Sequence, residues 1–129
     1  MNLNQVTLPA NDVRLSIDFY RRMGFKLIVN AAPHYARFEC PAGDATFSLH
    51  QSDESNNITQ GVVVYFECPE LDLKVQHLQS EGITFDQMPK NEQWLWREAR
   101  LLDPSKNRIC LYSAGTNRKN PPWRVNEAN

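Results

Sequence analysis

The sequence repeats itself, and this repeat constrains the fold more than any other feature of the chain. Residues 11–25 align without a gap with residues 69–83, at an offset of 58 positions. In both copies apolar residues recur at positions i, i+4 and i+7: Val13, Ile17 and Tyr20, then Leu71, Val75 and Leu78. This spacing predicts two amphipathic helices, each with one buried face. A chain built from two copies of one unit is expected to fold into two similar modules.

Strand-forming segments surround both predicted helices in the same order. Each helix ends at a glycine, Gly24 or Gly82, which can take the left-handed conformation that terminates a helix. The expected strands are 3–9, 25–30, 35–40 and 45–51, then 61–68, 83–87, 96–102 and 108–113. The polar segment 88–93 is expected to be a loop. The pattern is βαβββ twice, which predicts an α+β fold whose two modules pair into a curved mixed sheet.

The length of 129 residues suits one domain, and a second full-sized domain would not fit. We expect the domain to span residues 1–115, with modules at about 2–52 and 61–115. Residues 116–129 form a tail whose Pro121-Pro122 pair excludes regular helix. Because an exposed indole without a partner leaves a large apolar surface in water, Trp123 is expected to dock on the domain or on a second subunit.

Charge and hydropathy exclude several classes of partner. The formal net charge is −1 and no basic run is present, which argues against nucleic acid. No segment reaches the roughly 20 apolar residues of a membrane span, and the N-terminus lacks the pattern of an export signal. The three cysteines, Cys40, Cys68 and Cys110, lie far apart and suit reduced, buried thiols better than a disulfide framework or a zinc site. These features predict a soluble cytoplasmic protein without nucleic-acid or membrane partners.

Alternation along the strands sorts side chains onto two faces. One face is apolar and is expected to meet the helices: Val6, Leu8, Phe47, Leu49, Val62, Val64, Phe66, Ile109 and Leu111. The other face is largely polar: Gln5, Thr7, Thr46, Ser48, His50, Val63, Tyr65, Glu67, Arg108, Cys110 and Tyr112. This partition predicts a polar cup lined for a ligand. The alternative is that these side chains only satisfy one another around trapped water.

Two motifs accompany the repeat. They are D-x-x-x-S-x-x-F-Y-x-x-x-G-F, from Asp12 to Phe25, and D-P-x-x-N-R-I, from Asp103 to Ile109. With the repeat, they resemble the vicinal oxygen chelate superfamily, which includes glyoxalase I, extradiol dioxygenases and bleomycin resistance proteins. The resemblance covers residues 2 to about 115. It implies paired modules, within one chain or between two, and we expect a homodimer.

The resemblance also implies four inward-facing metal-ligand positions in the metal-dependent members. By strand position they fall on Gln5, Ser48, Val63 and Cys110. Glutamine can bind a metal, serine is a weak ligand and valine cannot coordinate at all. We therefore expect no catalytic metal and no other cofactor, with a displaced divalent metal site as the alternative.

Several residues carry a functional and a structural interpretation. His50 could act as a base or a metal ligand, with Glu67 or Glu98, or be a hydrogen-bonded histidine near a strand end. Cys110 could be a nucleophile or an inert buried thiol. Trp96, Glu98 and Arg100 share one strand face, which suits a flat or anionic ligand, or a cross-strand Arg–Glu pair on a solvent face.

The sequence thus predicts a protein that binds a small polar or aromatic molecule in the cup without the family metal. The alternative is a lyase, isomerase or dioxygenase that uses a non-standard metal site, or acid–base chemistry by His50 and Glu98. A third class, a dimerisation or scaffold protein, would have a filled cup. The expected ligand-binding residues are Gln5, Ser48, His50, Tyr65, Glu67, Trp96, Glu98, Arg100, Cys110 and Tyr112.

Overall fold

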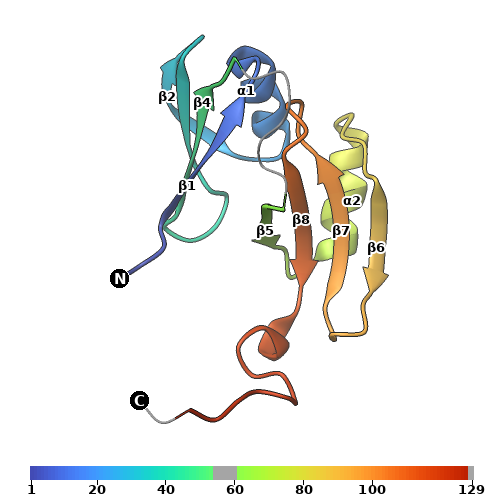
Figure 1. The fold of residues 1–129 in the computed structure, drawn as a ribbon. Helices are drawn as coiled ribbons and strands as arrows, with labels where there is room; N and C mark the ends of the chain where they lie inside the picture. Colours follow the sequence, from blue (N-terminus) through green and yellow to red (C-terminus); the bar gives the residue numbers. More distant parts are fainter. Residues whose placement is uncertain (54–60, 128–129) are drawn as a thin grey trace.

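The computed structural model describes residues 1–53 and 61–127 and contains the βαβββ unit twice (Figure 1). The first module comprises β1 (Gln5–Ala10), α1 (Val13–Arg22), β2 (Lys26–Ala31), β3 (Tyr35–Glu39) and β4 (Thr46–Gln51). The second comprises β5 (Val63–Glu67), α2 (Leu71–Ser80), β6 (Gln87–Asn91), β7 (Arg97–Leu102) and β8 (Arg108–Ser113). The predicted α+β class and the repeat are confirmed.

Each module forms its own mixed four-stranded sheet, and the two sheets have the same topology. The strand order is β1-β4-β3-β2 in the first sheet and β5-β8-β7-β6 in the second. The pairs β1–β4 and β5–β8 are parallel, and the remaining pairs are antiparallel. The helix of each module supplies the crossover that a strand order of this kind needs.

One strand and one loop of the second module were predicted wrongly. Residues 83–86 are not a strand, and most of the polar segment 88–93 belongs to β6. In β6, Gln87 pairs with Arg100 and Lys90 pairs with Glu98, with an irregularity between them. Pro89 lies within this irregular edge strand, where a missing N–H is tolerated. The segment is therefore a strand because its backbone pairs with β7, although its composition is polar.

Local signals define the limits of α1. Asp12 is the N-cap, and its carboxylate accepts a 3.1 Å hydrogen bond from the backbone N–H of Leu15. The helix buries the face that carries Val13, Ile17 and Tyr20. Beyond its C-terminus Gly24 has φ of +99°, a left-handed conformation that favours glycine. The periodicity and the terminating glycine therefore identified this element correctly.

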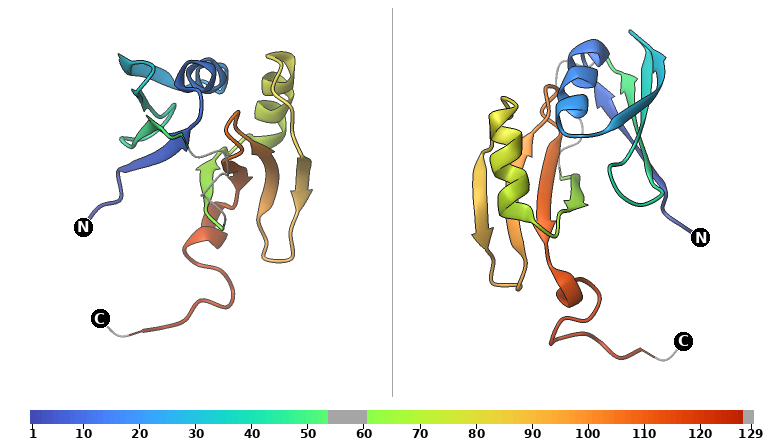
Figure 2. Two further views of the ribbon diagram at one scale, coloured as in Figure 1. Left: turned by 45° about the horizontal axis from the view of Figure 1, so that its top comes forward. Right: turned by 180° about the vertical axis from the view of Figure 1, so that it is seen from behind.

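The apolar faces of both sheets contribute to one hydrophobic core. Phe66 of β5 packs against Phe25 and Phe47 of the first module, with ring centroids 5.1 and 5.9 Å apart. Most of the predicted apolar face is buried or packs against this core, but Val62 precedes β5 and is exposed. Helix α1 lies between the first sheet and the second module, whereas α2 covers one face of the second sheet (Figure 2).

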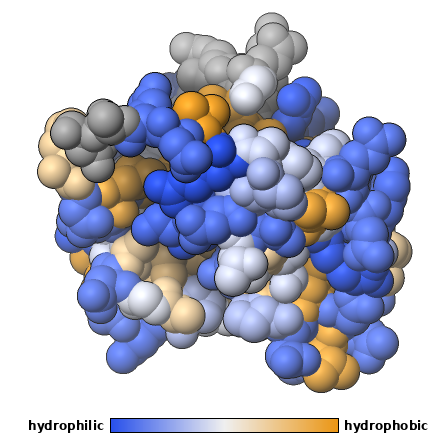
Figure 3. All heavy atoms as spheres, turned by 90° about the horizontal axis from the view of Figure 1, so that it is seen from below, coloured by the Kyte–Doolittle hydropathy of each residue, from blue (hydrophilic) through white to orange (hydrophobic). Residues whose placement is uncertain are grey.

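The tail leaves the body of the molecule after β8. A short 3₁₀ helix, Gly115–Arg118, begins it, and the indole N–H of Trp96 donates a 3.3 Å hydrogen bond to the carbonyl of Asn117. Farther on Trp123 is 58% exposed, so the prediction that it docks on its own domain is wrong. This end of the molecule is mainly hydrophilic, with small separate hydrophobic patches (Figure 3).

Two further expectations concern redox state and membranes. Cys40, Cys68 and Cys110 are free cysteines; Cys110 is buried as predicted, whereas Cys40 and Cys68 are only partly buried. Neither helix of the described part of the chain has the length and hydrophobicity that crossing a membrane requires.

Candidate functional site

The register of the strands places the predicted polar residues on the face of each sheet that points away from the core. We call these the first and second outer faces. The first outer face carries Gln5, Thr7, Tyr35, Arg37, Thr46, Ser48 and His50. The second carries Tyr65, Glu67, Glu98, Arg100, Arg108, Cys110 and Tyr112, with Trp96 beside them.

A buried carboxylate organises the second outer face. Glu98 is only 1% exposed, yet each of its oxygens accepts a short hydrogen bond. The indole N–H of Trp94 donates to Oε2 at 2.6 Å, and Nη2 of Arg100 donates to Oε1 at 2.7 Å. A buried charge is tolerated when it is paired and hydrogen-bonded in this way. The alternative of a cross-strand Arg–Glu pair on a solvent face is therefore wrong, because both residues lie on β7 and the carboxylate is buried.

Three aromatic rings lie beside this ion pair. Trp96 and Tyr112 stack, with ring centroids 4.5 Å apart and an interplanar angle of 16°. Tyr65 packs edge-on against both, with centroids at 5.9 and 5.7 Å. Tyr112 is buried, whereas Tyr65 remains 43% exposed. The cluster therefore has a buried base and an accessible ring, which suits contact with a flat molecule.

Cys110 lies on the floor of the second outer face between Tyr65 and Arg100, its neighbours across the sheet. It is fully buried. Burial, with a further contribution from the Glu98 carboxylate, raises the pKa of the Cys110 thiol to about 12. The thiol is therefore protonated at neutral pH, which supports the interpretation of an inert thiol over that of a nucleophile.

The first outer face contains a polar cluster that the sequence analysis missed. The hydroxyls of Tyr35 and Ser48 are hydrogen-bonded at 2.8 Å, and Nε of Arg37 donates to the Tyr35 oxygen at 2.9 Å. Desolvation acts to raise the pKa of Tyr35, but the hydrogen bonds from Ser48 and Arg37 and the Arg37 charge outweigh it and lower that pKa. Applying the same alternation to the strand at 35–40 would have found both residues.

The remaining predicted residues are exposed on the outer faces. Nδ1 of His50 lies 2.9 Å from the carbonyl oxygen of Gln51. Oε1 of Gln5 accepts a 2.7 Å hydrogen bond from the Thr46 hydroxyl. Glu67 is exposed at the end of β5. His50 lies on the first sheet, whereas Glu67 and Glu98 lie on the second, and among residues 1–53 and 61–127 no three His, Cys, Asp or Glu side chains could together hold a metal ion.

The residues at the four implied metal positions do not fit a divalent metal. Val63 has no ligand atom, and the Cys110 side chain is fully buried. The guanidinium of Arg100 lies next to Cys110, and its positive charge opposes a cation there. The remaining two donors, Gln5 and Ser48, are neutral oxygens already engaged with Thr46 and Tyr35.

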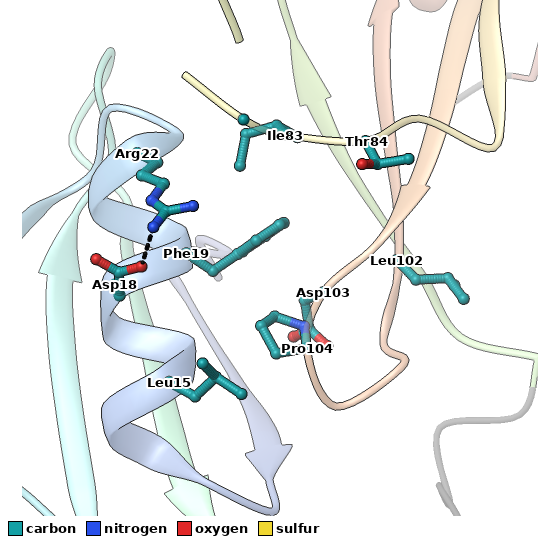
Figure 4. A pocket seen from close by; sticks show the side chains of 10 residues that line it. Leu15, Asp18, Phe19, Arg22, Ile83, Thr84, Leu102, Asp103 and Pro104 are labelled. Carbon is teal, nitrogen blue, oxygen red and sulfur yellow. Dashed lines mark ion pairs between the residues drawn. The ribbon is translucent and has the colours of Figure 1, made fainter. Parts of the chain in front are cut away.

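A cavity of about 310 Å³ lies elsewhere, at the junction of the modules (Figure 4). It opens between α1, the connection before β6 and the turn between β7 and β8. Along its α1 side, Asp18 and Arg22 form a 2.8 Å ion pair. Its buried carboxylate, Asp103, already accepts four hydrogen bonds. None of the predicted ligand-binding residues lines this cavity.

Within one chain, the outer faces do not combine into one site. The apolar faces of the two sheets share the core, so each outer face lies on the opposite side of its own sheet. Within the described part of the chain, the hydrogen bonds and ring contacts reported above for these side chains stay within one sheet.

Two mixed sheets built from βαβββ units define a class of proteins with paired modules. The sequence matches the family model of the Glyoxalase/Bleomycin resistance protein/Dioxygenase superfamily over residues 2–111, and the chain belongs to this superfamily. The resemblance inferred from the repeat and the motifs is thereby confirmed. No curated protein matches the sequence.

Solved structures share the fold at low sequence identity. A glyoxalase/bleomycin resistance protein/dioxygenase from Nocardioides has a TM-score of 0.72 at 19% identity, covering 98% of this chain and 90% of that one. The bleomycin resistance determinant of transposon Tn5 has a TM-score of 0.73 at 18% identity, covering 88% and 98%. A lactoylglutathione lyase from Agrobacterium tumefaciens has a TM-score of 0.71 at 16% identity, covering 87% and 92%.

Proposed function

We propose that this protein binds a small polar or aromatic molecule on its outer faces, without a metal at the family position. The observation that carries the proposal is the buried Glu98 carboxylate, which holds Trp94 and Arg100 in place. A buried charge on a sheet face is costly unless its surroundings are arranged to satisfy it. Such an arrangement beside an accessible aromatic ring is typical of a pre-organised binding surface.

We further propose that the binding cup forms between two copies of the chain. The first outer face of one protomer would meet the second outer face of its partner, because the two faces point away from the core that they share. A two-fold symmetric dimer would then contain two identical cups. Similarity to a bleomycin-binding protein crystallised with bleomycin supports a small-molecule ligand.

A titration with small aromatic and polar compounds tests the binding function, with intrinsic tryptophan fluorescence and the melting temperature as readouts. Replacement of the exposed ring in Tyr65→Ala should weaken binding. Leu73→Ala is the matched control, since Leu73 is an exposed apolar residue on α2, away from both outer faces. Equal binding by both variants and the unmodified protein would contradict the proposal.

Mixing two defective variants tests the shared cup. Tyr35→Ala disables the first outer face and Tyr65→Ala the second. If cups form between chains, a mixed dimer has one cup without either substitution, and binding returns to about a quarter of the cups after random exchange. If each cup lies within one chain, every cup keeps a substitution and mixing restores nothing. Stoichiometric Ni, Zn, Fe or Mn bound through Gln5 in protein purified without chelator would overturn the metal-free site.

The second candidate function is an enzyme of the same superfamily that uses acid–base chemistry. The cluster of Tyr35, Arg37 and Ser48 favours it, because Arg37 and Ser48 lower the pKa of the phenol toward the range useful for proton transfer. His50 pairs with Tyr35 across β3 and β4. By contrast, both oxygens of Glu98 already accept hydrogen bonds, which suits a positioning residue better than a general acid.

Turnover assays distinguish the two functions. A panel of glutathione adducts, catechols and short-chain acyl-CoAs should be tested with the unmodified protein, Tyr35→Phe and His50→Ala. The enzyme function predicts turnover by the unmodified protein. Tyr35→Phe should then abolish this turnover or shift its pH profile. Ligand binding without turnover across the panel supports the binding protein.

A further inference from the structure

Arg100 lies beside the position at which the metal-dependent relatives are expected to bind their metal. It pairs with Cys110 across β7 and β8, and Cys110 pairs with Tyr65 across β8 and β5. The three side chains therefore form one row across the second outer face. A positive side chain therefore lies next to one of the four implied ligand positions.

We propose that Arg100 binds the carboxylate of a small aromatic acid, whose ring lies against Tyr65 and Trp96. This inference rests on the proposed binding function and names the chemical class of its ligand. The guanidinium supplies a positive charge in a chain whose residues at the metal positions do not suit a metal ion. The neighbouring rings supply the flat apolar surface.

The hydrogen bonds of Arg100 leave donors for a ligand. Within the described part of the chain both of its side-chain hydrogen bonds use Nη2, to Glu98 at 2.7 Å and to the Tyr65 hydroxyl at 3.4 Å. A guanidinium has five N–H donors, so those on Nη1 and Nε are available. The side chain is 36% exposed, and the buried Glu98 fixes its orientation. A guanidinium held in this way loses little conformational entropy when a carboxylate binds.

The accessible charges around Arg100 are favourable to an anion. Glu98 is buried beneath its partners, and Cys110 is fully buried. Arg108, two residues before Cys110 on β8, is exposed on the same face and adds a second positive charge. Two further carboxylates lie near: Glu67 is in the next row, paired with Tyr112, and Glu92 is partly buried and accepts a 3.3 Å hydrogen bond from Gln87. Arg100 and Arg108 therefore place two positive charges on the face that an anion over Cys110 would approach.

The aromatic part of the ligand follows from the geometry of the rings. The guanidinium carbon of Arg100 lies 6.0 Å from the ring centroid of Tyr65, so the cation and the exposed ring are adjacent. Trp96 packs edge-on against Tyr65 as well, with ring centroids 5.9 Å apart. A ligand that places a carboxylate on Arg100 therefore places its next few atoms over Tyr65. A planar ring gains contact area there without ordering a flexible chain.

Benzoate and its uncharged analogue benzamide are the probes for the test. Titration of the full-length protein is followed by tryptophan fluorescence and calorimetry. Benzoate should bind the unmodified protein more tightly than benzamide, by roughly tenfold, as one charge-assisted hydrogen-bonded pair contributes. Arg100→Gln should lower benzoate affinity to the level of benzamide. Arg100→Lys, which keeps the charge but lacks the planar guanidinium, should lower benzoate affinity part of the way. Both changes should affect benzamide binding less than benzoate binding.

Arg97→Gln is the matched control. Arg97 lies on the same strand but bonds Asp72 of α2 on the opposite face, so its loss should not change benzoate affinity. Arg100→Lys retains the charge opposite Glu98 and keeps the test valid if Arg100→Gln unfolds. Equal affinities for benzoate and benzamide, or unchanged benzoate binding by Arg100→Lys, would overturn the inference. If uncharged aromatic compounds still bind, the proposed function survives this failure; if no probe binds, both fail.

Discussion

The hydroxyl of Tyr20 donates a 2.7 Å hydrogen bond to Oδ2 of Asp103, which joins the first helix to the turn between β7 and β8. Both residues are buried. The turn is further fixed because Asn107 Nδ2 donates to the carbonyl of Pro9 at 2.9 Å. The two modules are therefore joined by specific polar contacts as well as by the shared apolar core.

Removing this hydroxyl in Tyr20→Phe should destabilise the protein by about 1–3 kcal/mol, because a buried carboxylate loses one of its donors. Chemical denaturation measures the change in the free energy of unfolding. Tyr65→Phe, which removes an exposed hydroxyl with a 3.4 Å contact, should have a smaller effect. Equal stability of Tyr20→Phe and the unmodified protein would show that the bond contributes nothing.

The same residue predicts a pH dependence. Burial, and then the charge of Asp103 and the hydrogen bond to it, raise the pKa of Tyr20 well above 10.0. Folding therefore favours the protonated phenol, so this stabilisation is complete below pH 10 and decreases as the pH rises above it. Between pH 9 and the onset of base denaturation, about pH 11–12, the stability of the unmodified protein should fall more steeply than that of Tyr20→Phe. Parallel pH profiles would contradict this assignment.

Glu98 and Arg100 should be strongly coupled. A double-mutant cycle with Glu98→Gln and Arg100→Gln should give a coupling energy of about 1–3 kcal/mol, because each single change leaves a charge without its partner. A cycle on Arg97 and Asp72, an ion pair whose side chains are both substantially exposed, is the comparison and should show weaker coupling. If the coupling energy of Glu98 and Arg100 is no larger than that of Arg97 and Asp72, the buried ion pair does not organise the second outer face.

Cys110 should resist alkylation in the native protein. With a pKa of about 12, only roughly one thiol in ten thousand is ionised at pH 8. Burial raises the pKa of Cys40 and Cys68 as well, but both are partly accessible. Mass spectrometry after brief treatment with iodoacetamide should therefore find label on Cys40 and Cys68 before Cys110. Preferential labelling of Cys110 would restore it as a candidate nucleophile.

The tail should contribute to self-association. Arg124 donates to the carbonyl of Lys119 and to the side chain of Asn120, so the segment around the exposed Trp123 is held by its own hydrogen bonds. If this indole docks on a second subunit, Trp123→Ala should weaken the dimer in sedimentation experiments. Leu73→Ala, an exposed apolar residue of α2, is the control. Unchanged association by Trp123→Ala would leave the tail outside the interface.

Local patterns in the sequence predicted those parts of the fold that depend on local physics. The spacing of Val13, Ile17 and Tyr20 identified α1 and its buried face. Strand alternation found the outer faces, including the buried Glu98. The β6 strand was missed because its pairing with β7, and not its polar composition, makes it a strand.

Local sequence patterns could not predict contacts between segments that are far apart in the chain. The bond between Tyr20 and Asp103 joins residues 83 positions apart, and no periodicity relates them. The stacking of Trp96 on Tyr112 likewise depends on the register of β7 and β8. The cluster around Tyr35 was within reach of the alternation rule, since Tyr35 and Arg37 lie opposite His50 and Ser48 of the adjacent strand.

Each outer face lies on the side of its sheet that points away from the shared core. The residues needed for folding and the residues available for binding are therefore different ones. Residues such as Phe47 and Phe66 belong to the core on which folding depends, whereas Tyr65 and His50 lie on the outer faces and are exposed to solvent. Substitutions that alter ligand preference can therefore accumulate on the outward side chains of each strand while the inward ones stay fixed. A few substitutions on the outer faces can therefore change which ligand this fold prefers without changing its stability.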